Sequence, residues 1–415
     1  MAEPGRRLSP NLTAVLVLVV LAVALLAWQR PWQSSSDDAA EIPADAAIVL
    51  ADQFNLLSQA GDEKQFVAAA GSTQKARTFA KQAWAARSAL DAAQVDLRYV
   101  SGGEVADHAD GSTSAEVEVS WEPGDDSALT ESGRRTSTVT FRMAPQGDGT
   151  FAVQGVTRKD GPLPLWLAGR LTIDSSDDAV VIRVDGGDED LPLESMIAKA
   201  RADVARVVPE AEGPATIVSA HTERQMAALV GQPAADVDQI AAVTTSLDGR
   251  SGTATRTVIV LNPKVFATVD ARAAQVVLSH EATHLLTDAA GSSAEKWVIE
   301  GFADFVALHD DSAPLSLSAG QVLGKVKAGT GPTRLPTAAD FGATADGLGG
   351  VYESAWMIFR MLGEQHSDAD IVAFYDAVRG GTPVGTALKS AFGLTVKQLT
   401  SEWLAYLTKS ASTVS

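Results

Sequence analysis

The sequence predicts an α+β protein with an N-terminal transmembrane helix, a small α+β domain, and a larger domain of mixed sheet with a helical C-terminal part. An apolar run follows two arginines at the N-terminus, and four segments of strand period then follow two helical segments. The chain beyond them alternates between strand and helix patterns. The expected divisions are 1–32 for the anchor, 33–45 for a linker, and 46–160 and 168–410 for the two domains.

Composition indicates a globular protein and excludes several functional classes. The chain has 415 residues, of which 46% are hydrophobic and 20% are charged, which suits a protein with a substantial core. Its net charge of −19 would repel a phosphate backbone, so we expect no nucleic-acid partner. The chain contains no cysteine, which excludes disulfides, thiolate metal sites and a cysteine nucleophile.

The apolar run extends from Leu12 to Trp28, and its length of about 17 residues is near the lower limit for a membrane-spanning helix. Arg6 and Arg7 precede it and favour a cytoplasmic N-terminus. A cleaved signal peptide is the alternative, because it has the same order of charged and apolar residues. The sequence from Trp28 to Trp32 is a poor cleavage site, so we expect a retained anchor in the cell membrane and an extracytoplasmic location for both domains.

The first domain is predicted to begin with helices over Pro43 to Ala60 and from Ser72 to about Ala92. Four strands should follow in an antiparallel meander, because alternating apolar residues are separated by loops rich in turn formers. Their apolar positions are Val95, Leu97 and Tyr99; Val117, Val119 and Trp121; Val139, Phe141 and Met143; and Phe151 and Val153. This order of elements resembles the nuclear-transport-factor-2-like superfamily. A spacer domain and a ligand-binding domain are both compatible with it.

The second domain is predicted to combine strands with long helices. Its expected strands are Leu171 to Ile173, Val180 to Ile182, Ala215 to Val218, Ala241 to Thr245 and Thr255 to Leu261, with a helix over Leu191 to Val208. Asp270 is a suitable N-cap for a helix over about Ala271 to Thr287. Ser292 to Glu295 forms a capping-box pattern for the next helix, which should end near Leu308. Three further helices should cover the C-terminal part.

An H-E-x-x-H motif lies on the first of these two helices, formed by His280, Glu281 and His284. Side chains four residues apart share a helix face, so the two imidazoles can converge on one cation while Glu281 reaches a water beside it. Glu300 and Asp304 follow on the next helix. The pattern therefore supplies two nitrogen ligands, a carboxylate ligand, and a second carboxylate that can orient a histidine.

This segment resembles the gluzincin metallopeptidases, whose downstream ligand comes from an E-G-x-A-type helix, here Glu300-Gly301-Phe302-Ala303-Asp304. The resemblance covers about Leu171 to Leu407. The segment Tyr352-Glu353-Ser354-Ala355-Trp356 is also similar to the following helix in bacterial membrane-anchored members.

The resemblance implies a zincin-like domain in which His280, His284 and Glu300 hold Zn²⁺. It implies Glu281 as the general base of peptide-bond hydrolysis and Asp304 as the partner of a ligand histidine. The family usually adds a Tyr or His donor for the oxyanion. Tyr352 is the first candidate, although it is also explained as a packing residue, and the second is His366.

The strand from Thr255 to Leu261 lacks the acidic motif with which aminopeptidases of this group hold the substrate amine. We therefore expect a zinc endopeptidase with a protein or peptide substrate. The alternative function is an envelope binding or scaffold protein with a vestigial metal site. Metal content and cleavage by a Glu281→Gln variant distinguish the two.

Overall fold

The computed structural model of the chain describes residues 44–414 except 103–111, 125–126, 128, 130–133, 189, 248–256, 290–291 and 343–346. The expected anchor at 1–32 and most of the expected linker at 33–45 lie outside the described residues. The described part is α+β, as expected, and contains two separate sheets.

The expectation of an N-terminal transmembrane helix is corrected, and with it that of a single-pass location in the cell membrane. No helix in the described ranges is long and apolar enough to cross a membrane. Crossing takes about 20 apolar residues, whereas the two most apolar long helices have 12 and 16 residues. Leu12 to Trp28, on which the expectation depended, is not among the described residues.

The first sheet is a four-stranded antiparallel meander in the order β1-β2-β3-β4. Its strands are β1 (Ala92–Gly102), β2 (Thr113–Pro123), β3 (Arg135–Pro145) and β4 (Phe151–Asp160). Val117, Val119 and Trp121 of β2 are buried, as the alternating pattern predicts. This confirms the predicted order of strands.

Three helices cover this sheet: α2 (Ala44–Gln59), α3 (Glu63–Ala70) and α4 (Gln74–Ala89). The sequence predictions missed α3, which ends at Gly71. Gly71 has a φ of 113°, and a Cβ there would lie 2.7 Å from the Cα of Ala152. Only glycine suits this conformation and this approach of β4, and Thr73 then caps the separate helix α4.

The second sheet has five strands in the order β5-β6-β7-β9-β8. These are β5 (Leu171–Ser175), β6 (Ala179–Val184), β7 (Ala215–Ser219), β8 (Ala242–Thr245) and β9 (Val258–Leu261). The central strands β6, β7 and β9 are parallel and wholly buried, as expected for strands covered on both faces. The edge strands β5 and β8 are antiparallel to their neighbours.

Helices surround the second sheet and form the rest of the chain. They include the one-turn 3-10 helix η2 (Leu165–Leu167), α5 (Leu193–Val207), α6 (Glu223–Val230), α7 (Ala234–Val237), α8 (Pro263–Phe266), α9 (Ala271–Leu286) and α10 (Lys296–Ala307). The C-terminal group comprises α11 (Leu315–Ser318), α12 (Gly320–Lys327), α13 (Ala338–Phe341), α14 (Leu348–Gly363), α15 (Asp368–Arg379), α16 (Val384–Phe392) and α17 (Val396–Thr413).

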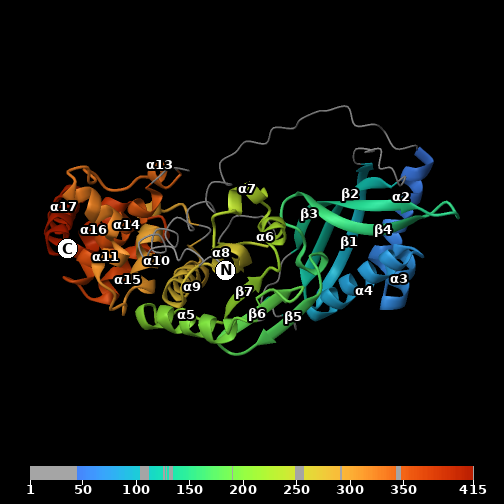
Figure 1. Cartoon of the computed structure of the whole chain (residues 1–415), viewed down its shortest axis with the longest axis horizontal. Coiled ribbons are helices and arrows are strands. Elements are labelled where there is room, and N and C mark those ends of the chain that lie inside the picture. Colours follow the sequence, from blue (N-terminus) through green and yellow to red (C-terminus); the bar gives the residue numbers. More distant parts are fainter. Residues whose placement is uncertain are drawn as a thin grey trace, which may run out of the picture.

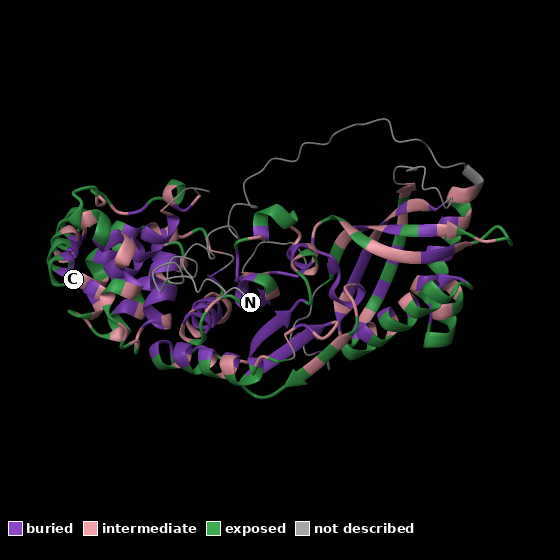
Figure 2. Cartoon of the chain, in the orientation of Figure 1, coloured by how far each residue is buried: buried purple, intermediate pink, exposed green. Residues whose placement is uncertain are grey.

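Figure 1 shows an elongated molecule, with the first sheet and α2–α4 at one end and the C-terminal helices at the other. The second sheet lies between them, next to α5 and α9. Figure 2 shows that buried residues fill β6 and β7. The predicted motif helix is buried continuously from Val277 to Thr283, a segment that includes His280 and Glu281.

Candidate metal centre

Helix α9 carries the H-E-x-x-H motif and begins at the predicted cap. The Asp270 side chain accepts a hydrogen bond from the backbone N–H of Ala273, which satisfies one of the free donors of the first turn. Helix α10 begins later than predicted, at Lys296. The expected capping box is absent, because Ser292 instead accepts from the nearby Ala294 N–H.

Helix α10 is buried on nearly all sides, from Trp297 to Val306, because it packs against α9, α5 and α14. It runs antiparallel to α9. His280 contacts Asp304, and His284, one turn later on α9, contacts Glu300, one turn earlier on α10. Both acidic side chains therefore face the motif helix, from consecutive turns of α10.

Three potential ligand atoms converge between the two helices. Nε2 of His280 and Nε2 of His284 lie 2.9 Å apart, and Oε2 of Glu300 lies 3.3 Å from each of them. The side chains of His280 and Glu300 are almost fully buried, whereas 12% of the His284 side chain is exposed. Solvent therefore reaches this group from the His284 side.

Asp304 orients one of the two imidazoles. Its Oδ1 lies 2.7 Å from Nδ1 of His280. A proton on Nδ1 that is shared with this carboxylate makes Nε2, which faces His284 and Glu300, the nitrogen available to a metal ion.

The donor set suits a metal ion. Oε2 of Glu300 is buried without a hydrogen-bond partner among the described residues, although both Nε2 atoms lie 3.3 Å from it. An unsatisfied buried oxygen that faces two imidazole nitrogens is the arrangement that a shared cation satisfies. The group formed by His280, His284 and Glu300 could therefore hold a metal ion.

The electrostatics of the pocket reflect the packing of acids around imidazoles. Burial opposes protonation of His280, but Asp304 and Glu300 outweigh it and raise the pKa of His280 to about 10. Burial alone would raise the pKa of Glu300, but the neighbouring His284 and His280 lower it to about 2. A cation therefore has a negatively charged ligand available here.

Glu281 lies beside this group in a different environment. It is 3% exposed, and burial raises its pKa, while His284 and His280 partly oppose that rise. The hydroxyl of Thr244, on strand β8, lies 2.6 Å from Oε2 of Glu281. The sequence predictions missed Thr244, because no local pattern connects positions 37 residues apart.

Tyr352 of α14 is fully buried, and its ring centroid lies 6.4 Å from that of His280. Burial, together with the charges of Glu300, Asp304 and Glu281, raises its pKa well above 10, so the hydroxyl stays protonated. His366 does not join the site. It packs on Phe392 beyond the end of α14, and the part of that helix from Tyr352 to Gly363 alone spans about 16 Å.

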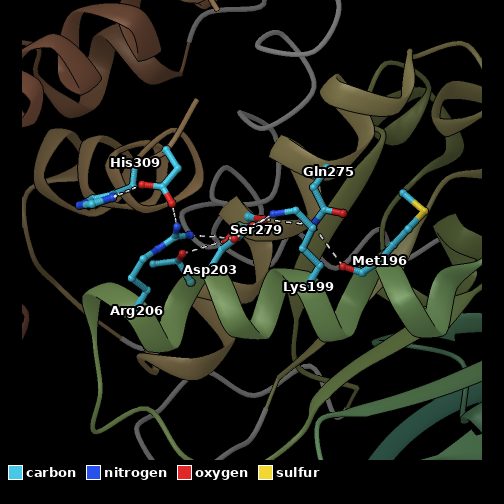
Figure 3. Close-up of polar contacts among 9 residues, drawn as sticks. Met196, Lys199, Asp203, Arg206, Gln275, Ser279 and His309 are labelled. Carbon is cyan, nitrogen blue, oxygen red and sulfur yellow. Dashed lines mark hydrogen bonds and ion pairs between the residues drawn. The ribbon is translucent and has the colours of Figure 1, made fainter. Parts of the chain in front are cut away.

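Helix α5 also contacts the motif helix, through side chains that the sequence predictions missed (Figure 3). Asp203 of α5 accepts a hydrogen bond from Ser279, the residue before His280, at 2.8 Å. Lys199 and Arg206 both contact the same carboxylate at 2.9 Å. Gln275 adds a bond to the main-chain oxygen of Met196. These contacts fix α9 relative to α5.

A protein-family model described as "BSP: Peptidase of plants and bacteria" matches residues 195–320. The match suggests a peptidase role. It spans less than a third of the chain, but it contains all five residues of the site on α9 and α10. A peptidase of this kind acts on protein or peptide substrates. No curated protein and no solved structure matches the chain.

Proposed function

We propose that the protein is a zinc-dependent endopeptidase with its site between α9 and α10. The observation that carries this proposal is the triangle of His280 Nε2, His284 Nε2 and Glu300 Oε2, with sides of 2.9, 3.3 and 3.3 Å. Ligands about 2.0–2.1 Å from a tetrahedral zinc lie roughly 3.3 Å from one another. Two nitrogens and one carboxylate also form the usual ligand set of a catalytic zinc with one open position.

When bound there, zinc would act as a Lewis acid that polarises a peptide carbonyl and acidifies water. Glu281 would accept the proton of the attacking water, and its raised pKa suits a base that works near neutral pH. The water oxygen forms a bond to the carbonyl carbon. The C–N bond then breaks as Glu281 passes the proton to the leaving nitrogen.

Two further side chains have supporting roles in this proposal. Asp304 would keep the proton of His280 on Nδ1, which preserves Nε2 as a ligand atom. The protonated Tyr352 hydroxyl would donate a hydrogen bond to the oxyanion of the tetrahedral intermediate. The endopeptidase assignment follows from the absence of an acidic residue among the described residues of strand β9, Val258–Leu261.

The proposal is tested with Glu281→Gln in the full chain. The amide introduced by this substitution cannot accept the water proton but leaves His280, His284 and Glu300 in place. We expect about one zinc per chain in both proteins, and a loss of about 10²- to 10⁴-fold in the rate of cleavage. Zinc is measured by elemental analysis, and cleavage by fluorescein-labelled casein and a library of internally quenched peptides.

Glu210→Gln is the matched control, because Glu210 is exposed and its substitution should change neither quantity. Undiminished cleavage by Glu281→Gln would rule out the mechanism. Purified chain that takes up no zinc and cleaves none of these substrates would favour the alternative of a binding or scaffold protein.

A further inference from the structure

Strand β8 brings one hydroxyl directly to the proposed general base. Thr244 lies on this edge strand, paired with Ile259 of β9. Successive side chains of a strand point to opposite faces, so Thr244 faces α9 while Thr245 points away. The Oγ1 of Thr244 lies 2.6 Å from Oε2 of Glu281 and 2.9 Å from its main-chain oxygen.

The shorter contact is the stronger one. A distance of 2.6 Å falls in the range of a hydroxyl bound to an ionised carboxylate, and Thr244 has one proton to donate. The Glu281 main-chain oxygen is also an acceptor, so it can receive only a weaker share of the same proton. The contact with Oε2 is therefore the one that holds the Glu281 side chain against β8.

The two carboxylate oxygens of Glu281 then differ. Oε2 is occupied by Thr244, whereas Oε1 has no hydrogen-bond partner within the described ranges. A carboxylate bound through one oxygen cannot rotate freely, and its second oxygen keeps a defined direction. Glu281 is thus left with one oxygen to receive a proton.

We infer that Thr244 is a positioning residue that fixes the carboxylate of Glu281 through Oε2 and leaves Oε1 to act on the attacking water. This inference rests on the proposed function, because it assigns the orientation of that reaction's base. It adds to the site a residue from the sheet, in addition to those of the two helices.

The first test uses Thr244→Val, which keeps the branched shape and removes the hydroxyl, and Thr244→Ser, which keeps the hydroxyl. With the best-cleaved peptide of the library, Thr244→Val should lower kcat by about 10- to 100-fold, the loss expected for a hydrogen bond to a charged group. Zinc content and KM should stay near those of the parent protein, because neither ligands nor peptide contacts change. Thr244→Ser should restore kcat to within about threefold.

The matched control is Thr245→Val on the opposite face, whose hydroxyl lies 3.5 Å from the main-chain oxygen of Ser246. It should leave kcat unchanged. The inference is overturned if Thr244→Val keeps its kcat, or if Thr244→Ser is as impaired as Thr244→Val, since shape rather than the hydroxyl would then matter.

A second readout is independent of cleavage. Thr244→Val should lower the urea midpoint of unfolding less in a Glu281→Ala background than in the parent chain, because the partner carboxylate is already gone. Equal shifts of the urea midpoint in the two backgrounds would show that Thr244 and Glu281 do not interact, and would overturn the inference. If the parent chain cleaves nothing, the proposed function fails, while this comparison still decides whether Thr244 holds Glu281.

Discussion

Glu353, next to Tyr352 on α14, is a buried acid outside the ligand set. It is 2% exposed and accepts a hydrogen bond of 2.7 Å from the Val322 N–H, at the start of α12. Burial raises the pKa of Glu353 to about 8, although the N–H groups of Val322 and Gln321 partly oppose the rise. The side chain therefore stays protonated in the folded protein at pH values at which the unfolded chain is ionised.

The raised pKa of Glu353 determines the direction in which the free energy of unfolding changes with pH. Between pH 4.5 and about 8 the folded chain binds more protons than the unfolded chain at this residue, so its contribution to the free energy of unfolding falls as the pH rises. Glu353→Gln keeps an acceptor for Val322 and cannot ionise. Relative to Glu353→Gln, the parent protein should lose a few kcal/mol between pH 5 and 8.

Urea unfolding at several pH values measures this difference, and Glu402→Gln, at an exposed position on α17, is the control that should follow the parent protein. Parallel pH profiles for the parent and Glu353→Gln would contradict the assignment.

At the scale of elements, the site depends on how closely α10 packs on α14. A Cβ on Gly301, the neighbour of Glu300, would lie 2.7 Å from the main-chain oxygen of Ala355 and 2.8 Å from a ring carbon of Phe359. The backbone of α14 cannot move aside without disturbing Tyr352 on the same helix. Glycine at 301 is therefore required by the approach of the two helices rather than by its φ angle.

Gly301→Ala should destabilise the chain by about 1–3 kcal/mol, because it overpacks this contact. Urea unfolding at fixed pH measures the change. Gly324→Ala is the matched control, since Gly324 lies within α12 and a Cβ there meets nothing within 4 Å. That control should be neutral or more stable by up to about 1 kcal/mol. A stabilising effect of Gly301→Ala would show that the helices can separate at no cost.

At the scale of the whole molecule, the segment from Leu163 to Leu167, which follows the first sheet and precedes the second, contacts helices of both. Leu165, Trp166 and Leu167 form η2 and are buried, and η2 packs against α4 of the first sheet's helices. The Leu163 N–H also donates to the main-chain oxygen of Ala228, on α6 beside the second sheet. We propose a domain boundary at η2, between units at 46–160 and 168–410.

Trp166→Ala should remove about 3–5 kcal/mol, as for other fully buried tryptophans, and should uncouple the two units. Calorimetry should then show a broadened or divided unfolding transition. Trp84→Ala, at a half-buried position of α4, should lower the midpoint less and keep the shape of the transition. A single sharp transition in Trp166→Ala would place the coupling elsewhere.

The local patterns of the sequence account for much of this structure. Alternating residues predicted the four strands of the first sheet, and the cap at Asp270 marked the start of α9. Short elements such as α3, α6 and α16 were not predicted, because few residues leave little periodicity. The start of α10 was misplaced because Ser292 bonds to Ala294 instead of forming a capping box.

The sequence by itself determined that His280, Glu281 and His284 share a helix face and that two acids follow on another helix, because those relations depend only on spacing. Only the tertiary structure decided that Glu300 and Asp304 reach the imidazoles, that Tyr352 lies nearby while His366 does not, and which partners hold the site. The contacts of Thr244 with Glu281 and of Asp203 with Ser279 join residues 37 and 76 positions apart. Contacts between residues so far apart in the sequence depend on how the helices pack on the sheet, and no local sequence pattern encodes that packing.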